Sequence, residues 1–333
     1  MQIHDLLIKS CEDGNPNVRK ASAVALGDLN VASSKITLAK LLRDPEPVVV
    51  EAAIYALGKL KATDAADHLV KLLGTEGDPA KGIMQGVSLK GDEDGAAPSA
   101  GAGPLGAGGG KKPTIHWKVR KAAALVLCKI KPELAVNRLI AVLDNENPNV
   151  VVAGLTGLGN MESEEAAPKM LELLKAESWE IRKSAATALG KICYAPAVPA
   201  LVALFADTRF AVRVEAVIAL NHIKSEDSLE ALMAALKKDD NPDVRRTIAV
   251  AIGNMKREKS IPALVEACKD EIWQVRKAAV TALVNFKTQS AANAAMEAIA
   301  DASDEVRMAA SQCYIKLSTA LALAHKGAGD VGD

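Results

Sequence analysis

The sequence has few aromatic residues, no long apolar run and no excess of charge of either sign. Aromatics make up 3% of the 333 residues, so a hydrophobic core has to be built from Leu, Ile, Val and Ala. The 41 basic and 41 acidic residues balance, which removes the electrostatic reason to expect nucleic acid or an anionic membrane as a partner. No apolar stretch reaches the roughly 20 residues that cross a bilayer. Because the first residues also lack the pattern of a secretory signal, we expect a cytoplasmic protein without a membrane span.

Motifs for catalysis and for metal binding are missing as well. The cysteines form no CxxC pair, no histidine is followed by glutamate, and no GxxxxGK[ST] phosphate loop occurs. We therefore predict no catalytic residue, no metal site and no cofactor. Two cysteines, Cys128 and Cys313, occupy core positions of the repeat described below, and reduced, buried thiols are expected. The five cysteines are Cys11, Cys128, Cys193, Cys268 and Cys313.

What the sequence does contain is one recurring stretch, best seen as IRKSAATALGKI at Ile181–Ile192. A branched apolar residue, called the marker here, is followed by Arg, small residues, Ala-Leu-Gly and another apolar residue. Successive markers are 31 or 32 residues apart, except for one interval of 70. Copies at a fixed period are the signature of a solenoid. The markers are Val18, Val49, Val119, Val150, Ile181, Val212, Val244, Val275 and Val306.

Each period divides into two amphipathic helices. In repeat five the first (the A helix) is expected over Glu164–Ala176 and the second (the B helix), which carries the recurring stretch, over Ser178–Lys191. We therefore predict an all-α fold, an α-solenoid of nine two-helix repeats that forms a single domain over 1–333.

Two recurring positions predict close packing between repeats. Glycine recurs within the B helix although it costs about 1 kcal/mol relative to alanine, which indicates a tight crossing between successive layers and not a helix end. Proline or an aromatic residue recurs just before or at the start of the B helix. The aromatic residues there fit a plug that packs on the neighbouring repeat, or alternatively an aromatic cage. The glycines are Gly27, Gly58, Gly159, Gly190 and Gly253, and the aromatic residues are Trp117, Trp179, Phe210 and Trp273.

Arginine follows the marker in seven repeats, and aspartate often stands six residues before that position, in the turn between the helices. The aspartate is expected to cap the B helix, or to pair with an arginine of its own or the adjacent repeat in a ladder. A track of arginines for phosphate groups is the alternative. The aspartates are Asp13, Asp44, Asp207, Asp239, Asp270 and Asp301.

The period fails once, between the two helices of repeat three. Residues 74–114 form a Gly/Ala/Pro-rich insertion whose second half is typical of flexible coil. Its first half carries Ile83, Met84, Val87 and Leu89, which could contact the solenoid or a partner. Residues 327–333 are expected to be a disordered tail.

The combination of Asp, a Pro or Trp turn, Val-Arg and Ala-Ala-x-Ala-Leu-Gly resembles HEAT-like repeats of the phycobilisome-lyase type over nearly the whole chain. The resemblance implies a right-handed superhelix with A helices on its convex side and B helices on its concave side. Two enzyme classes of this architecture do not fit: deoxyhypusine hydroxylases carry His-Glu pairs, and alkylpurine DNA glycosylases have a basic channel. The bilin lyases have no short signature to test, so a bilin lyase or bilin-handling subunit stays as the alternative function.

The leading hypothesis is a non-enzymatic scaffold that binds another protein. Basic residues two places after the marker surround apolar residues of the middle repeats, a pattern that suits an acidic or amphipathic segment in a groove over repeats four to six. No small-molecule ligand is expected except a bilin under the alternative. The candidate partner-binding residues are Lys20, Lys121, Val152, Leu155, Lys183, Val214, Val217, Ile218, Arg246 and Lys277, with Ile83, Met84, Val87 and Leu89 of the insertion.

Overall fold

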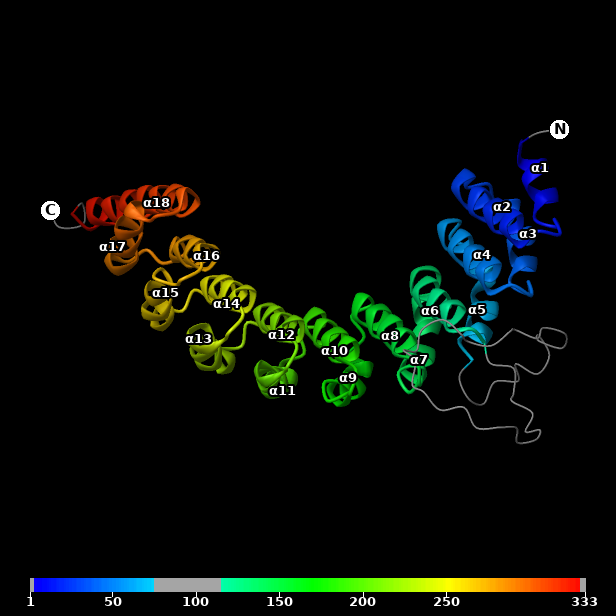
Figure 1. Ribbon diagram of the computed structural model, residues 1–333, viewed down its shortest axis with the longest axis horizontal. Helices are drawn as coiled ribbons and strands as arrows, with labels where there is room; N and C mark the ends of the chain where they lie inside the picture. The colour runs from blue at the N-terminus through cyan, green and yellow to red at the C-terminus, as the bar shows by residue number, and fades with distance from the viewer. Residues whose placement is uncertain (1–2, 75–114, 330–333) are drawn as a thin grey trace, which may run out of the picture. The chain divides into compact units, whose positions relative to one another are not determined.

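A computed structural model describes residues 3–74 and 115–329, and within these ranges it contains helices and no strand. Eighteen α-helices lie in the described residues and form consecutive pairs; a short turn joins the two helices of each pair except α5 and α6, between which residues 75–114 intervene (Figure 1). The odd-numbered helices are the A helices and the even-numbered ones the B helices. The predicted all-α class is confirmed.

The A helices are short, and several begin or end in a 3-10 turn. Their bounds are α1 Ile3–Ser10, α3 Ser34–Leu41, α5 Ala66–Leu73, α7 Pro132–Val142, α9 Ala167–Leu173, α11 Val198–Ala203, α13 Leu229–Lys238, α15 Ile261–Ala267 and α17 Gln289–Glu297. The B helices are longer: α2 Pro16–Leu29, α4 Pro47–Lys59, α6 Trp117–Ile130, α8 Pro148–Asn160, α10 Trp179–Lys191, α12 Phe210–Ile223, α14 Pro242–Met255, α16 Trp273–Leu283 and α18 Asp304–Gly329.

The chain divides into two compact units, Met1–Lys169 and Met170–Asp333, called the first and second unit. In the first unit α2, α4, α6 and α8 pack on one another in sequence, and in the second unit α10, α12, α14, α16 and α18 do the same. Apart from α9, which spans the boundary between the units, the A helices pack against the B helix of their own pair, so within each unit they form a second layer (Figure 1). Within the described residues no helix is both long and apolar enough to span a bilayer.

Side chains of the preceding turn hold the start of several B helices. Asp207 Oδ1 accepts the backbone N–H of Arg209, two residues on, at 2.9 Å, and the same contact is made at Asp44, Asp239, Asp270 and Asp301. The N-cap position itself comes two residues after this aspartate. Where the N-cap residue is asparagine, as at Asn241, its side chain accepts from the first helical N–H groups. The aspartate therefore shapes the turn before the helix, and the predicted capping role belongs to the next polar residue.

The recurring glycines lie where neighbouring B helices cross most closely. A Cβ on Gly190 would lie 2.6 Å from Ala219 Cα, and one on Gly253 would lie 2.6 Å from Ala282 Cβ. In the first unit Gly27 meets Ala56 in the same way. The prediction of a tight crossing is confirmed.

One crossing reverses this pairing. Cys128 occupies the glycine position of its helix, and Gly157 occupies the alanine position on the next helix, where an added Cβ would overlap Cys128 Sγ. The larger and the smaller residue have exchanged helices at this crossing. The exchange indicates that the crossing constrains the summed volume of the two side chains more than the identity of either one.

Candidate functional site: the exposed face of the B helices

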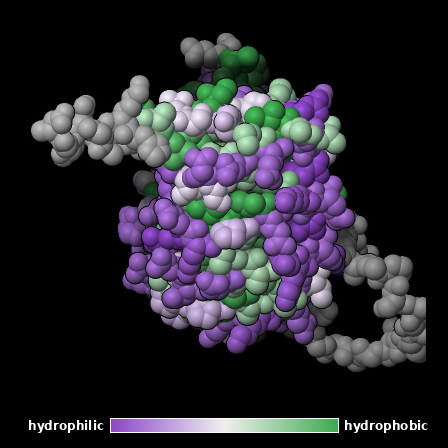
Figure 2. Space-filling model, turned by 90° about the vertical axis from the view of Figure 1, so that its left-hand side faces the viewer, coloured by the Kyte–Doolittle hydropathy of each residue, from purple (hydrophilic) through white to green (hydrophobic). Residues whose placement is uncertain are grey.

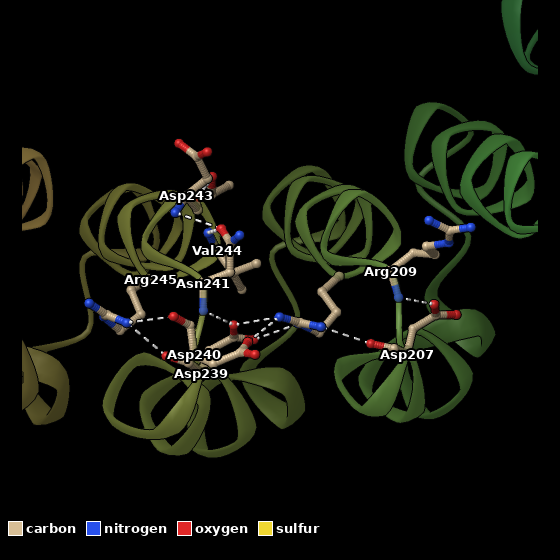
Figure 3. A network of polar contacts seen from close by, with 10 residues as sticks. Asp207, Arg209, Asp239, Asp240, Asn241, Asp243, Val244 and Arg245 are labelled. Atoms are coloured by element: carbon tan, nitrogen blue, oxygen red, sulfur yellow. Dashed lines mark hydrogen bonds and ion pairs between the residues drawn. The ribbon is translucent and has the colours of Figure 1, made fainter.

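Buried arginine–aspartate ion pairs, called the ladder here, join successive repeats. Arg213 donates from Nε and Nη2 to the two carboxylate oxygens of Asp239 in the next repeat, at 2.8 and 2.9 Å, and from Nη1 to the carbonyl of Asp207 in its own turn, at 2.9 Å. Figure 3 shows the two turns that these contacts join, labelled at Asp207 and Asp239. Each rung therefore ties three turns of chain together with charge-assisted hydrogen bonds. The other rungs of this kind are Arg19–Asp44, Arg182–Asp207, Arg245–Asp270 and Arg276–Asp301.

The ladder is a buried structural element. In all five rungs both side chains are at most 16% exposed. The hydrogen bond from Arg276 lowers the pKa of Asp301. Burial raises the pKa of Asp207 and Asp270, but hydrogen bonds from Arg182, Arg245 and the backbone outweigh burial and bring both pKa values below the ordinary one. Because these guanidinium groups already hold carboxylates, the ladder interpretation is supported over a phosphate track.

The solvent-facing side of each B helix is a stripe of four residues, which stand two before, two after, six after and ten after the marker. These positions are spaced by four, so they lie on one face of a helix. On α12 the stripe is Phe210, Val214, Ile218 and His222. Its neighbours are Trp179, Lys183, Thr187 and Lys191 on α10, and Pro242, Arg246, Val250 and Asn254 on α14.

The structure places eight of the predicted B-helix residues on this stripe and two in the core. Lys20 and Arg246 are exposed, and Lys121, Lys183, Lys277, Val152, Val214 and Ile218 are half-buried. The expectation that Leu155 and Val217 are exposed is wrong: each is 0% exposed. Both stand five residues after the marker, one residue before a stripe position. Because a helix turns about 100° per residue, their side chains point away from the stripe and toward the A helix. The insertion residues Ile83, Met84, Val87 and Leu89 lie outside the described residues.

At the third position of the stripe, six residues after the marker, sequence reasoning identified Ile218 and missed the other exposed apolar residues. Val24, Tyr55 and Val250 stand there and are 43%, 39% and 45% exposed. It also treated the aromatic residues of the turn as plugs, whereas Phe210 and Trp273 are 48% and 38% exposed and open the stripe of their helices. A spacing of four, applied forward and backward from the basic position, would have identified both sets.

In the second unit, α12 presents the most apolar stripe among the described B helices. Phe210, Val214 and Ile218 follow one another along it without an intervening charge. The flanking helices contribute Lys183 on one side and Arg246 on the other. Arg209, next to Phe210, lies over the Trp179 ring at 5.8 Å, which joins α10 and α12 at this end. The second unit thus has an apolar strip between cationic side chains.

The corresponding surface of the first unit is more mixed. A cavity of about 150 Å³ lies between α2 and α4, and Val24, Val48 and Tyr55 line it together with Lys20, Glu51 and Lys59. Lys59 forms an ion pair with Asp28 across the same two helices. Here charges of both signs stand next to the apolar groups, so the surface is not selective for one sign of charge.

Apolar side chains are also exposed on α18, and most lie off the stripe. Met308 is on it, whereas Ile315 and Leu323, 63% and 65% exposed, are not. Figure 2, which views the molecule from the side at which α18 lies in Figure 1, shows hydrophobic side chains interspersed with hydrophilic ones. The α12 stripe is therefore distinguished by its cationic flanks and not by apolar exposure alone.

The thiols are mostly unsuited to nucleophilic chemistry. Burial raises the pKa of Cys11, Cys128 and Cys313 to about 11 and that of Cys268 to about 12. Of the two thiols expected to be buried, Cys313 is buried and Cys128 is half-buried, and Cys193 is exposed. Among the side chains that the structure describes, no group of three His, Cys, Asp or Glu is placed to hold a metal ion.

Comparison with known proteins identifies the repeat. The family model of HEAT repeats matches residues 5–82, 115–178, 167–251 and 229–314. Escherichia coli YibA is similar over 88% of this chain and 96% of its own (15% identity, TM-score 0.57). Kap121p matches 96% of this chain with 38% of its own (16%, 0.54), and an engineered protein matches 99% with 93% (20%, 0.51). At these identities the likeness shows the fold alone.

No curated protein matches the chain. Because the HEAT-repeat model covers well over half of the sequence, the chain belongs to the HEAT-repeat family.

Proposed function

We propose that this HEAT-repeat chain is a non-enzymatic scaffold that binds a segment of another protein on the exposed face of its B helices. The observation that carries the proposal is the α12 stripe, where Phe210, Val214 and Ile218 stay accessible in a protein whose other B helices carry charged or polar residues at one or more of these positions. Contiguous apolar surface with a polar rim is typical of a protein-binding site.

The flanking charges define the kind of segment. Lys183 and Arg246 stand on either side of the strip, and Arg209 stands at its end. An amphipathic segment can place its apolar side chains on α12 and acidic side chains toward these cations. The ladder supports such binding, because Arg182–Asp207 and Arg213–Asp239 hold α12 at a fixed distance from both neighbours before the partner arrives.

Quantitative affinity purification from the native cell extract tests the proposal. Three chains are compared: the wild type, the double variant F210S/I218E, and the control I36S. Ile36 is 72% exposed on α3, so its variant removes an apolar surface residue outside the stripe. A protein partner retained by the wild type and by I36S, but reduced at least tenfold with F210S/I218E, is the expected result. Equal retention by all three chains, or a copurifying bilin chromophore in place of a protein, contradicts the proposal.

A further inference from the structure

The α12 stripe ends in a separate polar cavity of about 510 Å³. Cys193, Asn221, His222, Lys224, Asn254 and Lys256 line it, and they come from the last turns of α10, α12 and α14 and the residues that follow them. His222 is both the fourth residue of the stripe and part of the cavity lining. The apolar strip and the cavity are therefore continuous along one helix.

The lining is cationic and contains no acidic residue. Lys224 and Lys256 are exposed and have positive φ angles of 54° and 55°, each in the first residue after its B helix. Neither ammonium group forms a hydrogen bond or ion pair with any described residue. Acidic residues stand two places after each lysine, at Glu226 and Glu258: Glu226 forms an ion pair with Arg257 at 2.8 Å, and neither carboxylate pairs with Lys224 or Lys256. Two ammonium groups and an imidazole thus line one cavity, and neither ammonium group forms an ion pair within the described residues.

The amide side chains add hydrogen-bonding capacity. Asn254 Nδ2 donates to Asn221 Oδ1 at 3.3 Å, which links α12 and α14 across the cavity. The amide nitrogen of Asn221 keeps its donors for another acceptor. Lysines at helix ends also complement the helix dipole, but a dipole role does not require lysines of two repeats to line one cavity.

From this continuity we infer that the cavity binds carboxylates of the same protein segment whose apolar side chains lie on α12. The inference rests on the proposed function, and it adds how far apart the apolar and the acidic residues of the partner segment stand. Phe210 and His222 are 12 positions apart, or about 18 Å at 1.5 Å per residue. An extended chain covers that length in about six residues. The partner is therefore a segment with bulky apolar side chains and Asp or Glu within about six residues of them.

A random 12-residue peptide library panned against the whole protein tests the inference without knowledge of the partner. The wild type should enrich peptides that combine apolar residues with Asp or Glu at a fixed separation. The variant K224E/K256E should lose the acidic preference and bind the enriched acidic peptides about tenfold more weakly, as removal of two ion pairs implies. The control K238E/K269E changes two exposed lysines on the A-helix side of the second unit and should alter affinity less than twofold.

Different outcomes contradict the scaffold function and the carboxylate-binding cavity. If the wild type enriches no peptide, or if F210S/I218E enriches the same peptides as the wild type, the proposed function is wrong. If apolar peptides are enriched without Asp or Glu, or K224E/K256E keeps the acidic preference, the scaffold function stands and the carboxylate cavity is wrong. Melting curves of the variants complete the test, because lysines that acted only on the helix dipole would lower the melting temperature and leave peptide selection unchanged.

Discussion

The two units are built from the same pair of helices but differ in how successive B helices are joined. The second unit has four consecutive Arg–Asp rungs, from Arg182–Asp207 to Arg276–Asp301. In the first unit Arg19–Asp44 is a rung of this kind. Valine replaces the arginine at Val50 and Val151, where the side chains are 5% and 1% exposed.

The difference shows that the junction between repeats can be filled in two ways. A buried ion pair and a well-packed apolar group of similar volume often contribute similar stability, whereas half of an ion pair is costly. Unlike an apolar group, the ion pair also fixes geometry, because its directional hydrogen bonds hold the next turn in one position relative to the preceding helix. This matters on either side of α12, where the proposed binding strip needs its neighbours at a fixed spacing.

Acidification should produce the largest difference in stability between the two units, because it protonates the aspartates of several rungs at once. The folded-state pKa values of Asp207, Asp270 and Asp301 lie below the unfolded value of about 3.9. Their contribution to stability is therefore complete above that pH and is lost as the pH falls through the folded-state pKa values. Tryptophan fluorescence can follow each unit, with W117F reporting on the second and W179F/W273F on the first. The second unit should unfold at the higher pH, and coincident transitions would contradict the comparison.

Breaking one rung should have the next largest effect. In D270A the guanidinium of Arg245 loses its carboxylate while it stays buried, which should lower the free energy of unfolding of the second unit by about 3 kcal/mol. Urea unfolding in the W117F background measures the change. The variant R245V/D270A imitates the apolar junctions and should recover most of the loss. A double variant as unstable as D270A would show that the ion pair itself, and not the filled volume, holds the junction.

The crossing of B helices offers a smaller effect. G253A introduces a Cβ 2.6 Å from Ala282 Cβ, and overpacking of 1–3 kcal/mol set against the better helix propensity of alanine leaves a net loss of about 1 kcal/mol. G253A/A282G exchanges the two residues, as Cys128 and Gly157 do in the first unit, and should restore stability to within about 0.5 kcal/mol. Additive losses in the double variant would mean that the crossing does not depend on summed volume.

The smallest expected effect is the same in both units. Lys61 and Cys193 end their B helices at φ angles of 47° and 51°, a conformation that glycine adopts without strain. K61G and C193G should each raise the free energy of unfolding by about 0.5 kcal/mol, since the relief of strain exceeds the added chain entropy. Asn30, at 52°, provides the control: asparagine tolerates this conformation, so N30G should gain less. A loss in K61G would indicate that its side chain packs more than its exposure implies.

The repeat, the helix pairs and the tight crossings follow from the sequence because each depends on residues close together in the chain. Gly190 was identified correctly from its spacing alone, since a costly glycine inside a helix needs a close neighbour to explain it. For the rungs, the sequence left two alternatives open, because it does not say whether an arginine pairs with the aspartate of its own repeat or with that of the next one. In the structure Arg213 reaches both, its carboxylate partner being in the next repeat and its carbonyl partner in its own.

The candidate site was predicted less well, for a geometric reason. Val214 and Val217 are three residues apart and were assigned to the same surface, but the A helix covers the side of α12 on which Val217 lies. The cavity at the ends of α10, α12 and α14 was missed because its lining comes from three repeats, each contributing one to three residues that do not indicate a site by themselves. Lys224 and Lys256 can be recognised as parts of one site only in the structure, where the packing of α12 on α14 places both lysines around the same cavity.

Site-specific photo-crosslinking tests the central claim most directly. A benzophenone amino acid replaces Val250, which is exposed on α14 beside the α12 stripe, and in a control chain it replaces Ala234, which is exposed on the A helix α13. Irradiation in the native cell extract should give a discrete protein adduct at position 250 and none at position 234. Equal adducts at both positions, or an adduct at position 234 alone, would show that the partner does not bind on the exposed face of the B helices.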